Sequence, residues 1–178
     1  ISADEIYKTY IVKTGGVKIG KLTWGLNIDD TEYINSLELK SEGLLSALYS
    51  FKGEYLSKGF IKNNILEPQR YTHLWQTKKF TKRMELVFEE NKLKSLKQKP
   101  KEEERIRVNV FDIEAAKDPL TSFIQIIMGH KSSLVVDGRR LYTMISQIDN
   151  ENDKITIEIK NYNNLWTDHK KNDFEKII

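Results

Sequence analysis

Three histidines are the side chains best suited to metal binding or acid–base chemistry, and they lie far apart in the sequence. They are His73, His130 and His169, and no two of them form a ligand pair such as His-x-x-x-His. His130 follows Gly129 at an expected helix end, where a positive charge favours the terminal carbonyl groups. His73 fits a half-buried strand position, with a cavity-facing position as the alternative. We therefore expect no metal site and no metal cofactor.

Nucleophiles and paired carboxylates are equally weak signals in this chain. Neither Ser46 nor Ser122 lies in a Gly-x-Ser-x-Gly motif or beside a recognisable base. Asp118 and Glu114 are close in sequence, but Asp118 is better explained as the cap of a helix. The pair Gly15-Gly16 lacks the flanking residues of a phosphate-binding loop. The sequence therefore predicts no enzyme and no cofactor.

The charge distribution also argues against nucleic acid as a partner. The chain has 178 residues and no cysteine, and its 29 basic and 26 acidic side chains leave a net charge of only +3. A dense basic cluster could face anionic lipid headgroups, although a solvated run that protects a sheet edge is the simpler interpretation. The turn Asp137-Gly138-Arg139-Arg140 could bind an anion, but we expect an exposed hairpin. The basic cluster comprises Lys92, Lys94, Lys97, Lys99, Lys101, Arg105 and Arg107.

Aromatic residues are numerous in the expected strands, and most should be core. Any that pack incompletely would line a concave pocket able to hold an acyl chain or another amphipathic ligand. The candidate lining residues are Trp24, Tyr71, Trp75 and Phe123.

One segment carries a strong helix signal. Asp118 suits the N-cap, Pro119 suits the first helical position, and Gly129 suits a left-handed end. The apolar residues between them recur at helical spacing, which predicts a single apolar stripe over residues 119–128 that packs on a sheet. The stripe comprises Leu120, Phe123, Ile124, Ile127 and Met128.

The rest of the chain is patterned for strands. Residues 6–12 and 17–28 form an expected hairpin at Gly15-Gly16, with a bulge near Gly20 because the apolar parity changes there. A short helical turn is expected within 43–49, and a mobile charged loop at 97–105. Further strands are expected at 33–39, 51–61, 71–75, 84–88, 92–96, 134–137, 140–148 and 154–162.

The chain is expected to form a single domain over residues 1–178, without a transmembrane segment. No apolar run approaches the roughly 18 to 20 residues that span a bilayer. The sequence begins at Ile1 and not at methionine, and we favour removal of a signal peptide over truncation by design.

Several short segments, in this order, resemble a bacterial envelope family known only as domain of unknown function 3108. The resemblance implies an exported, periplasmic protein without established catalytic residues. It also implies a strongly curled antiparallel sheet or incomplete β-barrel around one helix, LolA/LolB-like or spiral-roll-like, as in lipoprotein carriers. The matching segments are Tyr10-Ile11-Val12, Gly16-Val17-Lys18-Ile19-Gly20, Glu42-Gly43-Leu44-Leu45-Ser46-Ala47-Leu48-Tyr49, Ser57-Lys58-Gly59, Pro68-Gln69-Arg70-Tyr71 and Asp118-Pro119-Leu120-Thr121-Ser122.

Two functions from different classes follow from these observations. The first is a non-enzymatic binding protein that holds a lipid-like or amphipathic ligand between the sheet and the helix. The second is a protein-interaction or structural module for envelope integrity, in which the helix fills the space completely and an envelope protein is the partner.

Overall fold

A computed structural model gives the arrangement of residues 4–47, 50–152 and 154–166. His169 and the terminal segment after Trp166 lie outside these described residues. The elements form a seven-stranded sheet, a three-stranded sheet and one α-helix. The prediction of a mainly β chain with antiparallel sheets and one helix is confirmed.

The large sheet is a simple antiparallel meander, in which each strand pairs with the next one along the chain. Neither sheet closes into a barrel, and β1 and β7 form the two edges of the large sheet. The strongly curled or barrel-like form expected from the sequence is therefore not what the structure shows. The seven strands are β1 (Asp4–Thr14), β2 (Val17–Ile28), β3 (Glu32–Ser41), β4 (Phe51–Lys62), β5 (Ile65–Thr77), β6 (Thr81–Glu89) and β7 (Lys92–Lys99).

Sequence features explain several local details of this sheet. The β1–β2 hairpin turns at Gly15 and Gly16, which both have positive φ, as the sequence predicts. The register shifts by one residue where Val12 faces Gly20, which confirms the expected bulge. A short 3-10 helix, η1 (Leu44–Ala47), precedes β4. The predicted mobile loop at 97–105 begins later than expected, because residues 97–99 belong to β7.

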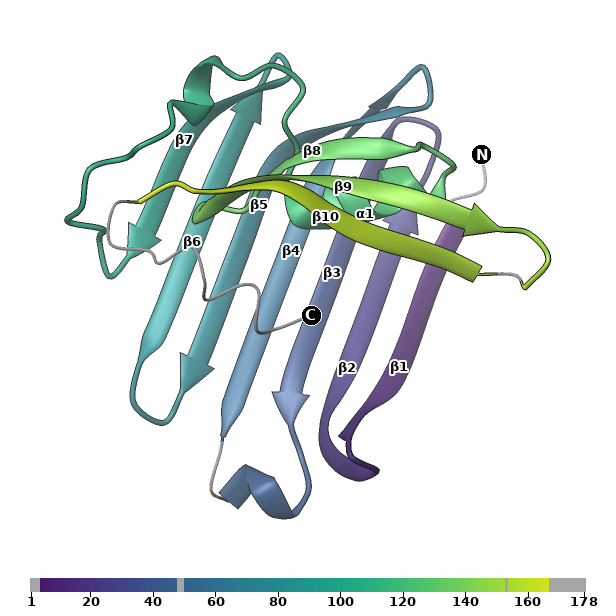
Figure 1. Cartoon of the computed structure of the whole chain (residues 1–178), viewed down its shortest axis with the longest axis vertical. Helices are drawn as coiled ribbons and strands as arrows, with labels where there is room; N and C mark the ends of the chain where they lie inside the picture. Colours follow the sequence, from purple (N-terminus) through teal and green to yellow (C-terminus); the bar gives the residue numbers. More distant parts are fainter. Residues whose placement is uncertain (1–3, 48–49, 153, 167–178) are drawn as a thin grey trace.

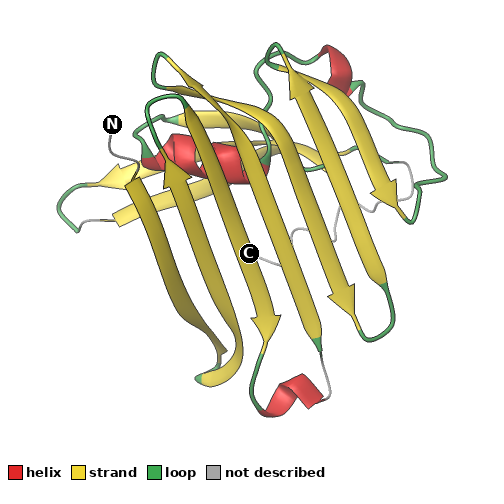
Figure 2. Ribbon diagram, turned by 180° about the vertical axis from the view of Figure 1, so that it is seen from behind, coloured by secondary structure: helices red, strands yellow, loops and turns green. Residues whose placement is uncertain are grey.

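The small sheet and the helix cover one part of one face of the large sheet (Figure 1). The helix α1 (Pro119–Ile127) follows a 3-10 helix, η2 (Val110–Asp112), and packs against both sheets. Viewed from behind, the large sheet has no described helix or strand over its other face (Figure 2). The small sheet has the order β10-β9-β8 and consists of β8 (Ser132–Val136), β9 (Arg140–Asp149) and β10 (Lys154–Asn164).

The helix is buried on a wider surface than the predicted stripe. Leu120 and Ile124 are buried as expected, but Ile127 is 44 % exposed. Ile126, outside the predicted stripe, is fully buried. The predicted stripe packs on the sheet at Leu120 and Ile124, but the prediction was too narrow because two sheets enclose the helix, so that more than one of its faces needs a partner. The helix also buries the polar residues Thr121, Ser122 and Gln125.

Candidate functional site

The two faces of the large sheet have different surroundings, and the strand register assigns each side chain to one of them. On β4, Ser57 bonds to Asp118 at the helix start, so Ser57 points towards α1. Its neighbours Leu56 and Lys58 must point away, because successive side chains of a strand alternate between faces. We call the face turned away from the helix the outer face.

The outer face carries an open hollow of about 930 Å³ that crosses the sheet, which we call the outer groove. In the strand register, its outward-pointing side chains form two adjacent rows across the strands. The first row is Tyr7, Ser36, Leu56, Thr72, Glu85 and Lys97, and the second is Thr23, Glu38, Glu54, Leu74, Arg83 and Lys99. The residues between the two rows, Leu37, Tyr55, His73, Met84 and Gln98, complete the lining.

The second row of the outer groove has an unusual charge order. Glu38 lies directly opposite Glu54 on the neighbouring strand, and Arg83 lies directly opposite Lys99. Like charges at directly opposed positions destabilise a sheet. Leu74 lies between the two pairs, next to Glu54 and Arg83. This row therefore has an acidic pair on β3 and β4, which we call its acidic end although Thr23 on β2 lies beyond it, and a basic pair on β6 and β7, its basic end. Leu74 on β5 separates the two pairs.

The two ends of the groove differ in how their charges are neutralised. At the acidic end, Lys40 lies 2.9 Å from Glu38, and Lys52 forms ion pairs with both Glu38 and Glu54. The hydrogen bond from Lys40 lowers the pKa of Glu38. At the basic end, neither Arg83 nor Lys99 forms an ion pair with any residue in the described part of the chain.

The middle of the groove is apolar and exposed. Leu56 is 42 % exposed, and it lies diagonally across the β4–β5 pair from Leu74. Outside the middle, on the edge strand β1, Tyr7 is 73 % exposed and lies opposite Gly25, where an added Cβ would approach the tyrosine ring at 3.7 Å. An apolar centre between two charged ends suits an amphipathic partner.

A buried polar network joins the helix to the other face of the large sheet. The Oδ1 atom of Asp118 accepts bonds of 3.0 Å from the amides of Leu120 and Thr121. Its Oδ2 atom accepts from the hydroxyls of Ser57, at 2.9 Å, and Thr121. The Thr121 hydroxyl also bonds the Tyr33 hydroxyl at 2.6 Å. Burial raises the pKa of Asp118, and it also raises the pKa of Tyr33.

Two further contacts fix the helix against the sheet. The Gln125 side chain accepts from the Leu66 amide at 2.8 Å and donates to the Asn64 carbonyl. The Asn35 side chain donates to the Leu120 carbonyl at 3.2 Å. These bonds satisfy buried polar groups between α1 and the large sheet, so the polar face of the helix serves its docking and needs no ligand.

The four predicted lining residues do not meet at one cavity. The edge of the Trp24 ring packs against Phe123, with 6.2 Å between the centroids, and its indole donates to Asn35. Tyr71 is buried in a different core cluster, and Trp75 stacks on Phe51. None of the four lines the outer groove. All of them lie on the helix side of the large sheet or on the helix itself.

The other candidate residues have structural surroundings. His73 stacks on Tyr55 at 4.3 Å, and burial together with the charge of Arg139 lowers its pKa to about 4. Its Nε2 atom is buried and has no hydrogen-bond partner among the described residues. Ser122 accepts a bond from Ser133. Within the described residues, no group of histidine and carboxylate side chains could hold a metal ion.

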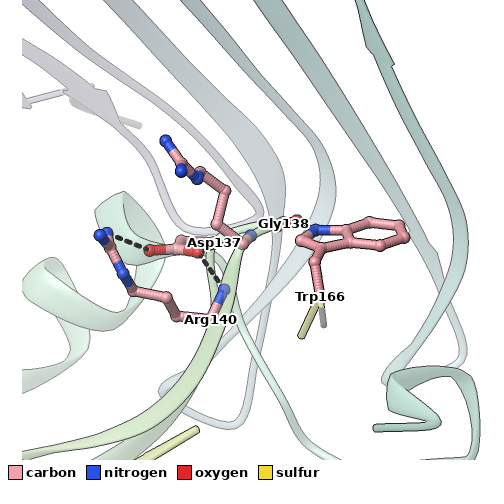
Figure 3. Close-up of polar contacts among 5 residues, drawn as sticks. Asp137, Gly138, Arg140 and Trp166 are labelled. Atoms are coloured by element: carbon pink, nitrogen blue, oxygen red, sulfur yellow. Dashed lines mark hydrogen bonds and ion pairs between the residues drawn. The ribbon is translucent and has the colours of Figure 1, made fainter. Parts of the chain in front are cut away.

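The turn between β8 and β9 is not the exposed hairpin expected from the sequence. Gly138 is buried, and a Cβ there would lie 1.7 Å from the Met84 sulfur. The Gly138 carbonyl accepts a bond from the Trp166 indole, while Asp137 accepts from the Arg140 amide and pairs with its guanidinium (Figure 3). The turn therefore packs the small sheet onto the large one.

Sequence reasoning found only part of the outer groove. It singled out Lys97 and Lys99 as members of a basic cluster, but it missed Glu38, Glu54 and Arg83. Each of these three is an ordinary charged residue at an exposed strand position. Their arrangement depends on the register of five strands, although the alternation of Glu38 with Leu37 and Leu39 already assigned it to the polar face.

The fold and the groove define a class of protein: a two-sheet β protein with a central helix and an open groove on the outer sheet face. The chain belongs to the family described as protein of unknown function (DUF3108), whose family model matches residues 9–127. No curated protein and no solved structure matches the chain. Among the described residues, no helix has the length and apolar character needed to cross a membrane.

Proposed function

We propose that the chain is a non-enzymatic protein-interaction module of the cell envelope, and that its outer groove binds an amphipathic segment of a partner protein. The placement in the envelope, in the periplasm after removal of a signal peptide, rests on the resemblance to exported members of the family. The proposed interaction rests mainly on the order of charged side chains along the second row of the outer groove.

The charge order has a cost to folding at the basic end, and a partner would offset it. Both pairs place like charges side by side, but Lys40 and Lys52 neutralise Glu38 and Glu54, whereas Arg83 and Lys99 form no ion pair within the described residues. A segment with basic residues at one end, apolar residues in the middle and acidic residues at the other end would complement both pairs and cover Leu56 and Leu74. Such complementarity favours the correct partner and the correct orientation.

The dimensions of the groove set the length of that segment. Four strand spacings of ~4.8 Å separate β3, which carries Glu38, from β7, which carries Lys99, and they give roughly 19 Å, which is about six residues of extended chain. Two rows of outward side chains form a strip roughly 7 Å wide, because residues two apart on a strand are separated by that distance. A single peptide segment fits such a strip.

The test uses a six-residue probe peptide with two lysines, then two leucines, then two glutamates. Its control has the same composition in the repeating order lysine, leucine, glutamate. We call the probe, in which like residues are grouped, the block peptide. We expect the block peptide to bind about tenfold more tightly than the control peptide, with NMR shifts centred on the Leu56 and Leu74 methyl groups. Equal binding of both peptides, or shifts centred elsewhere, would count against the proposal.

Matched variants locate the site. Glu54→Lys and Arg83→Glu should each weaken the block peptide about tenfold, because each replaces an attraction with a repulsion at one end. Lys58→Glu changes the charge by the same amount as Arg83→Glu, and it lies on the same face outside the lining of the groove. Lys58→Glu should leave the affinity within a factor of two.

A lipid-like ligand is the second candidate, and the helix side of the sheet favours it. Phe51 and Trp75 stack at 5.6 Å, next to the stacked pair of Tyr55 and His73, and all four are only partly buried. Such a partly exposed apolar strip could hold an acyl chain. Monomeric lysophosphatidylcholine that shifts the Trp75 resonance, while the block peptide shifts nothing, would favour this candidate.

A further inference from the structure

The two edges of the large sheet are protected to different degrees. The β7 edge carries Lys92, Lys94, Lys97 and Lys99 among eight residues, and Lys92 forms a bridge with Glu114. Lysines and covering segments of this kind discourage pairing between sheet edges. The β1 edge is eleven residues long, contains no proline, and within the described residues pairs only with β2.

The β1 edge also exposes large apolar side chains. Tyr7, Tyr10 and Ile11 are all exposed, and Ile6 and Val12 are only partly buried. A long exposed edge with apolar side chains is a ready template for another strand. The sequence of β1 indicates which strand would fit.

We propose that β1 pairs in antiparallel orientation with β1 of a second copy, about a two-fold axis at Thr9. Antiparallel edge pairing of identical strands requires an axis perpendicular to the sheet, which keeps each face of one copy next to the same face of the other. Directly opposed side chains must then point to the same face, so the numbers of two opposed residues must add to an even sum. The axis therefore lies midway between two copies of the same residue, which face each other.

The register centred on Thr9 is the most complementary of the central ones. Residue numbers of opposed positions then add to 18, so all residues from Asp4 to Thr14 have a partner. Glu5 faces Lys13 of the second copy twice, once on each side of the axis. Thr9 faces Thr9 of the second copy, and the remaining pairs are Asp4 with Thr14, Ile6 with Val12, Tyr7 with Ile11, and Lys8 with Tyr10.

The neighbouring registers are less favourable. An axis at Lys8 places two lysines opposite each other and sets Glu5 against Ile11. An axis at Tyr10 leaves Asp4 and Glu5 of each copy without a partner in the strand and contains no opposite-charge pair. Only the Thr9 register combines the full length of the strand with two ion pairs and several apolar or aromatic pairs. It would also leave both outer grooves on the same face of one continuous sheet.

Cross-linking tests the register directly, because the chain contains no cysteine. A Thr9→Cys variant would place two thiols at directly opposed positions, and we expect efficient symmetric cross-linking by oxidation or by a short bis-maleimide. Thr23→Cys is the matched control, since Thr23 lies opposite Thr9 on β2, one strand in from the edge. Equal cross-linking of both variants, or none for Thr9→Cys, would overturn the proposed register.

Charge reversal tests the pairing without cysteine. Sedimentation should show a dimer with a dissociation constant on the order of 10 to 100 μM, as expected for a small interface. Glu5→Lys alone and Lys13→Glu alone should each raise this constant about tenfold, because each places like charges at two symmetric positions. An equimolar mixture of the two variants should form heterodimers at least as stable as the original dimer.

The outcomes separate this interface from others. Glu151→Lys, in the exposed turn between β9 and β10, is the charge control and should leave the dimer unchanged. A chain that stays monomeric at about 1 mM would overturn the proposal. A dimer that is indifferent to both β1 charge variants, or variants that fail to rescue each other on mixing, would overturn it as well.

Discussion

Replacement of Asp118 tests whether the buried polar network anchors the helix between the sheets. Asp118 is fully buried, caps the helix through two amides and accepts from the Ser57 and Thr121 hydroxyls. Loss of a helix cap costs ~1 kcal/mol, and each lost hydroxyl bond costs about 1 kcal/mol more. We therefore expect Asp118→Ala to lower the free energy of unfolding by about 3 kcal/mol.

Asp118→Asn separates the cap from the charge. Asparagine keeps an oxygen for the two amides, and its amide group can donate to Ser57 and Thr121, since those hydroxyls can accept. The expected loss is therefore only about 1 kcal/mol. Asn109→Ala is the control, because Asn109 caps the short η2 helix from an exposed position and should cost about 0.5 kcal/mol.

Urea denaturation followed by tryptophan fluorescence would measure all three variants. For a chain of this size the alanine variant should also melt roughly 6 to 12 °C lower. An Asp118→Ala loss below about 1 kcal/mol, or an equal loss for asparagine, would refute the assigned role of the carboxylate.

The difference in stability between the wild-type chain and Asp118→Asn should depend on pH with a defined sign. Burial raises the folded-state pKa of Asp118 above its usual 3.8. The folded state therefore takes up a proton before the unfolded state as the pH falls towards 4. The wild-type chain should gain stability relative to Asp118→Asn over that interval, and a constant difference would show that burial does not control this carboxyl.

Three further changes test other parts of the fold. Gly59→Ala should cost more than about 2 kcal/mol, because its Cβ would lie 2.1 Å from the Glu67 carbonyl, whereas Gly16→Ala meets open space and should cost about 1 kcal/mol for its positive φ. Gln125→Leu should cost about 1 to 3 kcal/mol in urea denaturation, since it leaves the buried Leu66 amide without an acceptor. The lowered pKa of His73, about 4, means that the unfolded chain protonates first as the pH falls from 6.5 to 4, so the wild type should lose stability there and His73→Phe should lose less.

The strands and turns were largely predictable because local chemistry determines them. The alternation of apolar side chains, the Gly15-Gly16 turn and the helix cap at Asp118 act over a few residues. The structure contains each of these predicted elements, with small changes in their first and last residues. The β7 strand extends to Lys99, beyond the predicted end at Leu96, because cross-strand partners on β6 continue to Arg83. Pairing with a neighbour outweighed the polar composition of that segment.

The second sheet layer over the helix was not predictable in the same way. Ser122 and Ile126 are both buried. The sequence carried no signal for this burial, because Ser122 is polar and Ile126 lies outside the predicted stripe. The Ser122 hydroxyl receives a bond from Ser133 on β8, a contact between elements whose relative placement no local pattern encodes. A helix between two sheets needs several buried faces, and its polar side chains are tolerated where each finds a partner.

The outer groove shows why a candidate binding surface on a sheet is difficult to recognise from sequence. The charges of Glu38, Glu54, Arg83 and Lys99 have no informative spacing along the chain, and they acquire meaning only when the register places like charges together. On an edge or a solvated surface, opposed charges of opposite sign would be more stable than this order. The Arg83/Lys99 pair forms no ion pair within the described residues and lies on the sheet face that no described helix or strand covers, so it is the feature on which the proposed partner binding rests.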